Sequence, residues 1–408
     1  MARSRWMVIG CMAIVTAVMF LASGAEAAGT DSSPSPSRLV TITIPAPVGE
    51  IPSEWLSYSG PPQADVLLPA GYSPRKRYPL LVLLHGLGGN YASYASAGEA
   101  SVFGGLDAIV VMPEGGSGWY TDWWNDGERD SPGWESYELD EVIPAVLARY
   151  PILPERRYHA IAGTSMGGLG AVYLGGRLPG FFGSVASLSG LDDLQYLDPL
   201  TQPAMGLTSL APFNGDFDLD PVDGPPSGFY FKGHNPPLLA VNLQQTRVFE
   251  STGTGIPSSA GLSTLLPGLG SILEGTVEEL LIIYAMNELY HTALTAAGVD
   301  VTYQVHSGGH DIPDFDNEIK AMLAWGLFNP VADDPTSWVN DTVATTGQLW
   351  DIGYSFAQPP SQVVQFRQSG SSLSISAAGS AVTVTSSGGC TVNTRTPATV
   401  LIPRGRGR

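Results

Sequence analysis

A single G-x-S-x-G motif, at residues 163–167, narrows the folds open to this chain. A β-rich run, Tyr158–Ala162, precedes the motif, and a helix-forming run of small residues, Gly167–Arg177, follows it. A nucleophile elbow requires this order of strand, tight turn and helix, and its glycines leave room where a side chain would collide with a neighbouring strand or helix. We therefore expect Ser165 to be a catalytic nucleophile; the alternative is a Gly-Ser helix cap without chemistry.

A serine hydroxyl is a weak nucleophile and needs a base that takes its proton. His310 lies in a glycine-rich loop between an expected strand, Val299–His306, and an expected helix, Asn317–Leu327. The chain order of serine, acid and histidine places the base in such a loop. We expect His310 to be the base. The rival is His306, but its place at the end of a strand favours a packing role.

The base needs a carboxylate that orients its imidazole ring and stabilises the charged form of the ring. The expected strand at 246–251 has no acid at its tip, and the next carboxylates are those of Glu274, Glu278 and Glu279. The last two begin the helix that precedes His310, and we expect Glu279 to be the acid. Glu278 stays open as an alternative. Both also have a simpler interpretation, as acids that interact favourably with a helix N-terminus.

The negative charge that forms on an attacked carbonyl oxygen needs two backbone N–H groups. One should belong to Met166, which directly follows the nucleophile. The other should lie after the first buried strand, where residues 85–90 read HGLGGN and the glycines let the backbone approach a substrate. We expect Leu87 to be this second donor; a glycine-rich turn without a role is the alternative.

The part of the chain from residue 39 to residue 330 is expected to be one catalytic domain. Short apolar runs at Tyr78–Leu84 and Leu106–Met112 are typical of fully buried strands, and Glu138–Arg149 has the apolar spacing of a helix. The alternation of strands and helices predicts an α/β fold, in which a mostly parallel sheet is covered by helices on both faces.

Other segments depart from this alternation. Residues 196–238 and 254–272 are rich in Pro, Gly or Ser, and we expect them to be long irregular loops that can shape a substrate site. After Asn329 and Pro330, short runs of apolar, Ser and Thr residues alternate with period two between Gly/Ser turns. These runs predict a small antiparallel β module over residues 331–408, which ends in a basic tail.

The first 27 residues have the three parts of a secretory signal peptide. Arg3 and Arg5 make a positive start, an apolar run extends from Trp6 to Ala22, and residues 25–27 have the small-x-small form of a cleavage site. We therefore expect secretion with cleavage near Ala27, and no retained membrane anchor. Residues 28–38 are expected to be a Ser/Pro linker.

Charge and cysteine content argue against several classes of protein. The chain has 19 basic and 38 acidic residues and a formal net charge of −19, which argues against nucleic acid or an anionic membrane surface as a partner. Removal of the expected signal peptide leaves Cys390 as the only cysteine, so no intramolecular disulfide can form. The two cysteines have no ligand spacing, which excludes a cysteine-based zinc site. We expect no metal and no cofactor.

Residues 60–328 resemble the putative-esterase family of the α/β-hydrolase superfamily, which includes esterase D-like enzymes and the secreted mycolyltransferases. Residues 119–124 and 134–135 are similar to an aromatic stretch of the mycolyltransferases. The other matching segments are the elbow at 163–167, the run SLSG at 187–190, the run TGTG at 252–255 and the pair GH at 309–310.

This resemblance implies that the acid is a glutamate on the helix after the TGTG run, which supports Glu279, and that the oxyanion donor is Leu87. Two departures concern the sugar acceptor of the mycolyltransferases. His85 and Gly88 stand where those enzymes carry an Asp and an Arg that act on the acceptor, and Asp311 follows the histidine where they have a serine. These differences argue against a trehalose-specific acyltransferase.

The leading hypothesis is a secreted serine carboxylic ester hydrolase that forms an acyl-enzyme on Ser165. The first alternative is an acyltransferase of the mycolyltransferase type, which passes the same acyl group to a sugar or glycerol acceptor. The second alternative is a non-catalytic surface-binding protein on a hydrolase fold. The expected substrate is a small-molecule, lipid or polymer ester.

Overall fold

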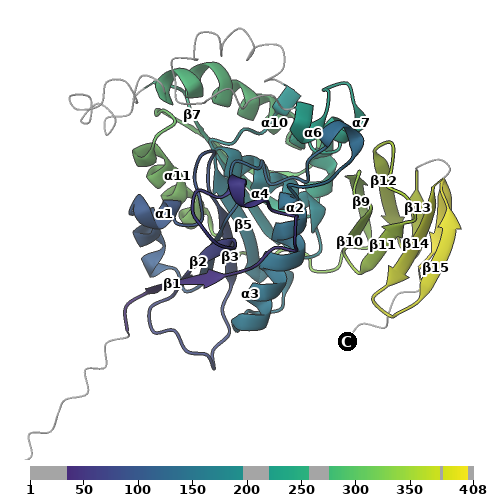
Figure 1. Cartoon of the computed structure of the whole chain (residues 1–408), viewed down its shortest axis with the longest axis horizontal. Helices are drawn as coiled ribbons and strands as arrows, with labels where there is room; N and C mark the ends of the chain where they lie inside the picture. The colour runs from purple at the N-terminus through teal and green to yellow at the C-terminus, as the bar shows by residue number, and fades with distance from the viewer. Residues whose placement is uncertain (1–34, 196–219, 257–274, 377–379, 403–408) are drawn as a thin grey trace, which may run out of the picture. The chain divides into compact units, whose positions relative to one another are not determined.

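The computed structural model describes residues 35–195, 220–256, 275–376 and 380–402. Its largest element is an eight-stranded sheet with the order β1-β2-β4-β3-β5-β6-β7-β8 (Figure 1). β1 and β2 pair antiparallel with each other and β2 with β4, and all later pairs are parallel. The strands are β1 (Arg38–Thr43), β2 (Gln63–Leu68), β3 (Leu80–Leu84), β4 (Ile109–Pro113), β5 (His159–Thr164), β6 (Ser184–Leu188), β7 (Arg247–Gly253) and β8 (Asp300–His306).

Helices cover both faces of this sheet, as the alternation in the sequence predicts. The longer ones are α3 (Ile143–Arg149), α4 (Met166–Arg177), α10 (Tyr284–Ala297) and α11 (Ile312–Trp325). Two turns of π-helix, η4 (Tyr137–Val142) and η7 (Glu279–Ile283), lead into α3 and α10. The short helices are η1 (Ser53–Trp55), α1 (Ser93–Ser96), η2 (Glu99–Gly105), η3 (Asn125–Gly127), α2 (Trp134–Ser136), η5 (Arg156–Tyr158), α6 (Asp220–Asp223), α7 (Phe229–Lys232) and η6 (Pro236–Leu243).

The strand β3 shows why its sequence is apolar at every position. Side chains alternate between the two faces of a sheet, and both faces are covered here. Leu80, Val82 and Leu84 pack into the core shared with α3, α4 and α10, whereas Leu81 and Leu83 pack into the core shared with η2 and α11. All five side chains are buried. The strand β3 therefore has no solvated face, which explains its continuous apolar sequence.

Two expectations differ from the structure: where the last helix begins, and whether residues 196–238 are irregular. The helix expected at Asn317–Leu327 begins at Ile312, because the carboxylate of Asp311 caps it by accepting the N–H of Asp314 at 3.1 Å. The described part of the expected loop 196–238 contains α6, α7 and the start of η6. Two of its aromatic residues, Tyr230 and Phe231, are buried against the domain, so this part is packed structure. Residues 196–219 and 257–274 of the two expected loops lie outside the described residues.

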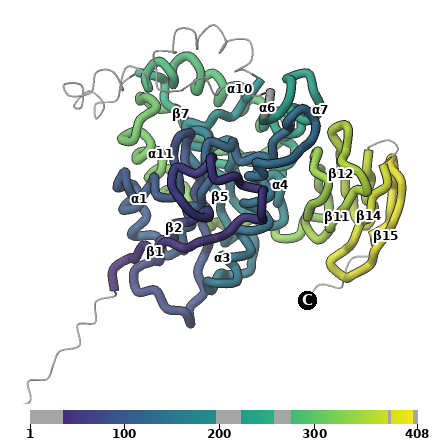
Figure 2. The backbone as a smooth tube through the Cα atoms, in the orientation of Figure 1, coloured from purple at the N-terminus to yellow at the C-terminus, as the bar shows by residue number. Residues whose placement is uncertain are grey.

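The strands after residue 330 form two four-stranded antiparallel sheets with the orders β10-β11-β14-β15 and β16-β13-β12-β9 (Figure 2). They share a core of their own, built from inward-facing residues such as Leu349, Phe366 and Val384. The strands are β9 (Ser337–Thr342), β10 (Thr346–Leu349), β11 (Ile352–Phe356), β12 (Val364–Ser369), β13 (Ser372–Ile375), β14 (Ala381–Ser386), β15 (Thr391–Arg395) and β16 (Ala398–Leu401).

Candidate active site

Ser165 lies in the turn between β5 and α4, with backbone angles φ 57° and ψ −123°. A non-glycine residue rarely adopts this conformation, and such strain is concentrated at functional sites. The two motif glycines permit the turn. A Cβ on Gly163 would lie 2.2 Å from the carbonyl oxygen of Gly167, and one on Gly167 would lie 2.1 Å from that of Leu84. The expected strand, turn and helix are therefore present, with the serine at the carboxyl edge of the sheet.

His310 and Glu279 are brought together by the loop after β8 and the first turn of η7. The Nδ1 atom of His310 lies 2.9 Å from Oε2 of Glu279. Because an ionised carboxylate only accepts hydrogen bonds, Nδ1 is the donor, and the neutral ring then has its lone pair on Nε2. The Nε2 atom has no hydrogen-bond partner among the described residues. A histidine with a free, buried Nε2 is poised to exchange a proton with a substrate.

Glu279 is completely buried and is held by donors from two neighbouring strand ends. Its Oε1 atom accepts the backbone N–H of Gly253 at 2.6 Å, the hydroxyl of Thr252 at 2.8 Å and the hydroxyl of Ser189 at 2.9 Å. With Oε1 held by the sheet, Oε2 points to the histidine. This arrangement fixes the orientation of the imidazole ring, which is the task of the acid in such a group.

Glu278 lies at the other nitrogen of the same ring. Its Oε1 atom is 4.0 Å from Nε2 of His310, and its side chain is 21% exposed. The two glutamates that the sequence leaves open are therefore separated by geometry: Glu279 bonds to Nδ1, and Glu278 faces Nε2 from the cavity wall. The roles of Ser165, Glu279 and His310 in catalysis remain predictions.

The surroundings of His310 favour its charged form. Burial by itself would lower the pKa of the ring. The charge of Glu278, the hydrogen bond to Glu279 and the charge of Glu279 act in the opposite direction and together raise the pKa of His310 to about 9. At neutral pH the free site therefore holds mostly imidazolium.

A second histidine–glutamate pair, which the sequence does not indicate, lies next to the first. The Nε2 atom of His306 is 2.8 Å from Oε1 of Glu318, and the hydroxyl of Ser189 lies 3.0 Å from the same oxygen. Burial, opposed by the bond to His306, raises the pKa of Glu318 to about 7. Ser189 directly follows β6, and the parallel strands β6 and β7 end at the same edge of the sheet. This position in the sequence could have indicated that Ser189 lies near the site.

The glycine-rich loop after β3 reaches Ser165. A Cβ on Gly86 would lie 3.3 Å from the Cβ of Ser165. The buried His85 pins this loop: its Nε2 accepts the N–H of Gly115 at 2.9 Å, so its Nδ1 donates to the carbonyl of Gly86 at 2.9 Å. Burial lowers the pKa of His85 to about 4, which keeps the ring neutral for both bonds. His85 therefore holds the backbone of this loop in place.

The expected oxyanion donors occupy suitable places. Leu87 follows Gly86 in the loop and lines the cavity that contains Ser165, and Met166 is the buried first residue of α4. The N–H of Met166 thus lies at a helix N-terminus, where the helix dipole favours negative charge. Their function as oxyanion donors stays a prediction.

A cavity of about 510 Å³ contains both Ser165 and His310. Its apolar walls come from the loop after β3, the loop after β6 and the start of α11, through Leu87, Leu191, Ile312 and Phe315. Two carboxylates, of Glu99 and Glu278, also line it. Burial and the charge of Asp316 raise the pKa of Glu99 to about 7. The cavity therefore combines apolar walls with two acidic side chains.

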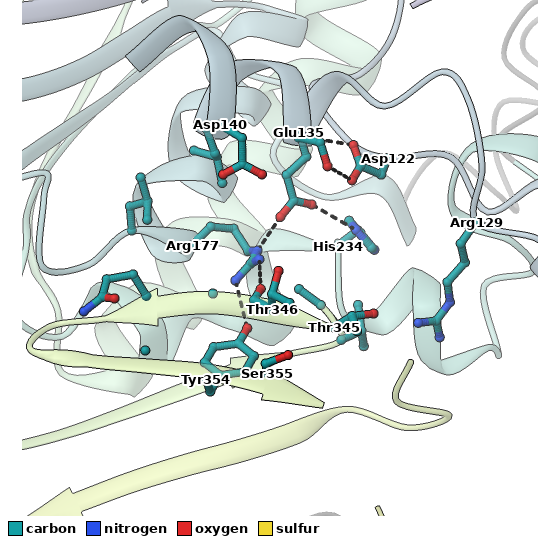
Figure 3. A pocket seen from close by; sticks show the side chains of 18 of the residues that line it. Asp122, Arg129, Glu135, Asp140, Arg177, His234, Thr345, Thr346, Tyr354 and Ser355 are labelled. Carbon is teal, nitrogen blue, oxygen red and sulfur yellow. Dashed lines mark hydrogen bonds and ion pairs between the residues drawn. The ribbon is translucent and has the colours of Figure 1, made fainter. Parts of the chain in front are cut away.

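A larger cavity, of about 610 Å³, lies between α2, α4 and α7 on one side and β10, β11 and β14 on the other (Figure 3). Its centre is a buried ion pair in which Nε of Arg177 lies 2.5 Å from Oε1 of Glu135, and Tyr173 donates to the other carboxylate oxygen at 2.6 Å. Ser165 and His310 do not line this cavity. The carboxylate of Glu135 also lies 3.8 Å from Nε2 of His234, so a buried charge cluster stands between the helices and the following strands.

The aromatic stretch at 119–124 belongs mainly to the core. Trp119 and Tyr120 are buried, and Tyr120 donates to the carbonyl of His85 at 3.0 Å. The carboxylate of Asp122 accepts the N–H of Ser136 at 2.9 Å and its hydroxyl at 2.6 Å. None of these residues lines the cavity with Ser165. The stretch therefore supports the loop of His85 and the start of α2.

Two further features concern only residues that the structure describes. Among them, no group of three or more His, Cys, Asp or Glu side chains is arranged so that it could hold a metal ion. Within the same parts of the chain, every helix is too short or too polar to cross a membrane.

Comparison with known proteins agrees with this fold. Residues 57–253 match the model of a family described as putative esterase. The protein named Esterase Rv1288 of Mycobacterium tuberculosis is 35% identical over 135 residues, which are 32% of this chain and 29% of that protein. The match thus spans less than a third of that relative's length.

Two mycobacterial proteins are similar over longer stretches. Diacylglycerol acyltransferase/mycolyltransferase Ag85B of Mycobacterium leprae is 28% identical over 275 residues, which are 64% of this chain and 76% of that protein. The crystal structure of MPT51 (FbpC1) of Mycobacterium tuberculosis is similar with a TM-score of 0.53 and 20% identity, over 71% of this chain and 98% of that one. With the strand order above, this likeness shows the α/β-hydrolase fold.

Proposed function

We propose that this chain, whose residues 57–253 belong to the putative esterase family, is a secreted serine carboxylic ester hydrolase. The observation that carries the proposal is the placement of His310. Its Nδ1 is bonded to the buried Glu279, no described residue forms a hydrogen bond with its Nε2, and it shares a cavity with the strained Ser165. A nucleophile, a base and an orienting acid in this order are the parts that acyl transfer requires.

The chemistry follows from these positions. Nε2 of His310 takes the proton of Ser165 while the serine oxygen attacks the carbonyl carbon of the ester. The N–H groups of Leu87 and Met166 stabilise the oxyanion. The protonated Nε2 then donates to the leaving alcohol, and Glu279 stabilises the imidazolium in this step. Water, activated by the same nitrogen, attacks the acyl-enzyme and releases the acid.

A second candidate function is acyl transfer to a sugar or glycerol acceptor, because the chain resembles a mycolyltransferase over 64% of its length. Both functions share the acyl-enzyme and differ only in the group that attacks it. His85, which stands where mycolyltransferases carry an acceptor-binding Asp, is buried and bonded to the backbone of Gly86 and Gly115. Both ring nitrogens of His85 are thus occupied by backbone groups, which favours hydrolysis as the leading function.

Secretion is part of the proposal and rests on the composition of the first 27 residues, which lie outside the described residues. Arg3, Arg5 and the apolar run to Ala22 have the pattern of a signal peptide. Expression of the full chain in an exporting bacterial host, followed by N-terminal sequencing of protein from the medium, tests it. A mature N-terminus near Ala28 is expected, and retention of the uncleaved chain in the cell overturns it.

Hydrolysis of p-nitrophenyl esters of increasing acyl length tests the catalytic proposal. We expect turnover by the wild type and its loss in Ser165→Ala, with a covalent acyl-enzyme visible by intact-protein mass spectrometry only in the wild type. Addition of glycerol or a sugar then separates the two functions, because a transferase diverts acyl groups to the acceptor. A wild type that is inert on every ester favours the surface-binding hypothesis.

A further inference from the structure

Glu278 has a place in the site that the proposed mechanism does not use. It lines the cavity of Ser165, and its Oε1 atom lies 4.0 Å from Nε2 of His310. The ring is nine-tenths buried, and this Nε2 has no hydrogen-bond partner among the described residues. The carboxylate therefore stands beside the one nitrogen that exchanges protons with the reacting groups.

We propose that Glu278 selects substrates by the charge of their alcohol part, favouring cationic or neutral alcohols and disfavouring anionic ones. This inference rests on the proposed ester hydrolysis and adds the substrate class. Glu278 acts here as a specificity-determining residue, whereas Glu279 orients the base.

The geometry of the reaction places the alcohol next to Glu278. Nε2 donates its proton to the oxygen of the leaving alcohol, so this oxygen must come within hydrogen-bond distance of Nε2. The carboxylate is 4.0 Å from the same atom, and a charged group attached to that oxygen through a short chain lies within a few ångströms of it. The ring gains only the proton that Ser165 gives up, and a negative charge forms on the attacked oxygen at the same time, so the reaction itself does not cancel the charge of Glu278.

The remaining lining of the cavity does not offset this charge. Among the described residues that line it there is no Lys or Arg, and the other carboxylate, Glu99, has the same sign when ionised. The apolar walls, which include Leu191 and Phe315, weaken screening by water. An anionic alcohol part would therefore meet repulsion from Glu278 with no Lys or Arg among the described lining residues to offset it, and such repulsion is one way in which a site rejects the wrong charge.

Three butyryl esters with alcohol parts of nearly equal shape test this inference. They are the ester of choline, which is cationic, the ester of 3,3-dimethylbutanol, which is neutral, and the ester of 2-hydroxyethanesulfonate, which is anionic. Both charges are permanent across the working pH range. For the wild type we expect kcat/KM to be lower for the anionic ester than for the neutral one by roughly tenfold, and to be at least equal for the cationic one.

The variant Glu278→Gln removes the charge and keeps the shape of the side chain. We expect the anionic-to-neutral ratio of kcat/KM to rise by roughly tenfold and the cationic-to-neutral ratio to fall. Because each ratio compares substrates on the same protein, a general loss of activity or of folded protein does not affect it. Glu288→Gln is the matched control, because it makes the same chemical change at a different place. Glu288 lies on α10, is exposed and does not line the cavity. The ratios of this variant should equal those of the wild type.

The outcomes separate this inference from the proposed function. If the wild type hydrolyses all three esters at equal kcat/KM, or if Glu278→Gln leaves the ratios unchanged, selection by Glu278 is wrong while ester hydrolysis stands. If no ester is hydrolysed by any of the proteins, the proposed function itself fails. A shift in both ratios in opposite directions, absent from the control, supports the inference.

Discussion

Two adjacent glutamates contact opposite nitrogens of one histidine, and they should differ sharply when they are replaced. Glu279 holds Nδ1 of His310 at 2.9 Å, whereas Glu278 lies 4.0 Å from Nε2 and is partly exposed. Only the first contact decides which nitrogen carries the proton. Glu279 therefore sets the tautomer of His310, whereas Glu278 affects the charge of its ring.

The replacement Glu279→Gln should lower kcat on a neutral ester by roughly 10³- to 10⁴-fold, because the amide can hold the wrong tautomer of His310 and cannot stabilise the imidazolium. The change Glu278→Gln should cost far less, since Nδ1 keeps its partner. Steady-state kinetics of both variants, with circular dichroism melting as a check on folding, provide the test. Equal losses in two folded variants would show that Glu279 is not the orienting acid.

The charge around His310 predicts the pH dependence of the reaction. The base must be neutral to accept the proton of Ser165, and the pKa of His310 is raised to about 9. Below that pH, kcat/KM should fall about tenfold for each pH unit, because only the deprotonated fraction reacts. Removal of the Glu278 charge takes away one cause of the raised pKa, so the midpoint should move to lower pH. A profile that is flat between about pH 7 and about pH 9 would contradict this assignment.

At the scale of elements, the joint between β5 and α4 depends on backbone approach that only glycine allows. A Cβ on Gly167 would lie 2.1 Å from the carbonyl oxygen of Leu84 in β3, and backbone cannot move aside as a flexible side chain can. The close packing of Gly167 on β3 therefore fixes the position of the neighbouring Ser165 relative to the centre of the sheet.

The replacement Gly167→Ala should lower the free energy of unfolding by about 3 kcal/mol and should also impair catalysis, because the helix must shift away from β3. Gly105→Ala is the control: its Cβ would meet no atom within 4 Å, so the stability should change little. Urea unfolding of the two variants measures the difference. Similar values for both would mean that the joint relaxes without cost.

At the scale of the whole molecule, the strands after residue 330 are joined to the domain by specific polar contacts. Asn340 of β9 donates to the carbonyl of Gly176 in α4 at 2.8 Å, and the side chain of Asn242 bonds to both backbone groups of Asp341, at 2.7 and 2.9 Å. The helix α4, which begins directly after Ser165, thus ends against these strands. We infer that they stabilise the domain at the far end of α4.

The buried pair of Arg177 and Glu135 lies at this junction, and Arg177 also approaches the hydroxyl of Tyr354 at 3.4 Å. The replacement Arg177→Met leaves the Glu135 carboxylate buried without its main partner, so we expect the free energy of unfolding to fall by about 3 to 5 kcal/mol. Adding Glu135→Gln should recover part of this loss, because it removes the buried charge. Thermal and chemical unfolding of both variants measure it, and a double variant no more stable than Arg177→Met would argue against a charge effect.

Local patterns were sufficient for the parts of the site that lie within one strand–turn–helix unit. The motif at 163–167 predicted the turn at Ser165, because its glycines and flanking runs are adjacent in the chain. The apolar run of β3 and the alternation of strands and helices predicted a mostly parallel sheet with two covered faces, since those patterns have the periods of the elements themselves. The loop position of His310 followed from the order of elements.

Contacts between distant segments could not be read in this way. The choice between Glu278 and Glu279 depends on which carboxylate meets donors from Ser189, Thr252 and Gly253 at the ends of two other strands. The pairing of His306 with Glu318 and the burial of α7 also join residues that are separated in the chain. By itself, the sequence determined the elbow, the buried strands and the order of the candidate groups, because these are local. Only the tertiary structure decided which charge faces which atom of His310, because that depends on how strand ends and helix starts converge at one edge of the sheet.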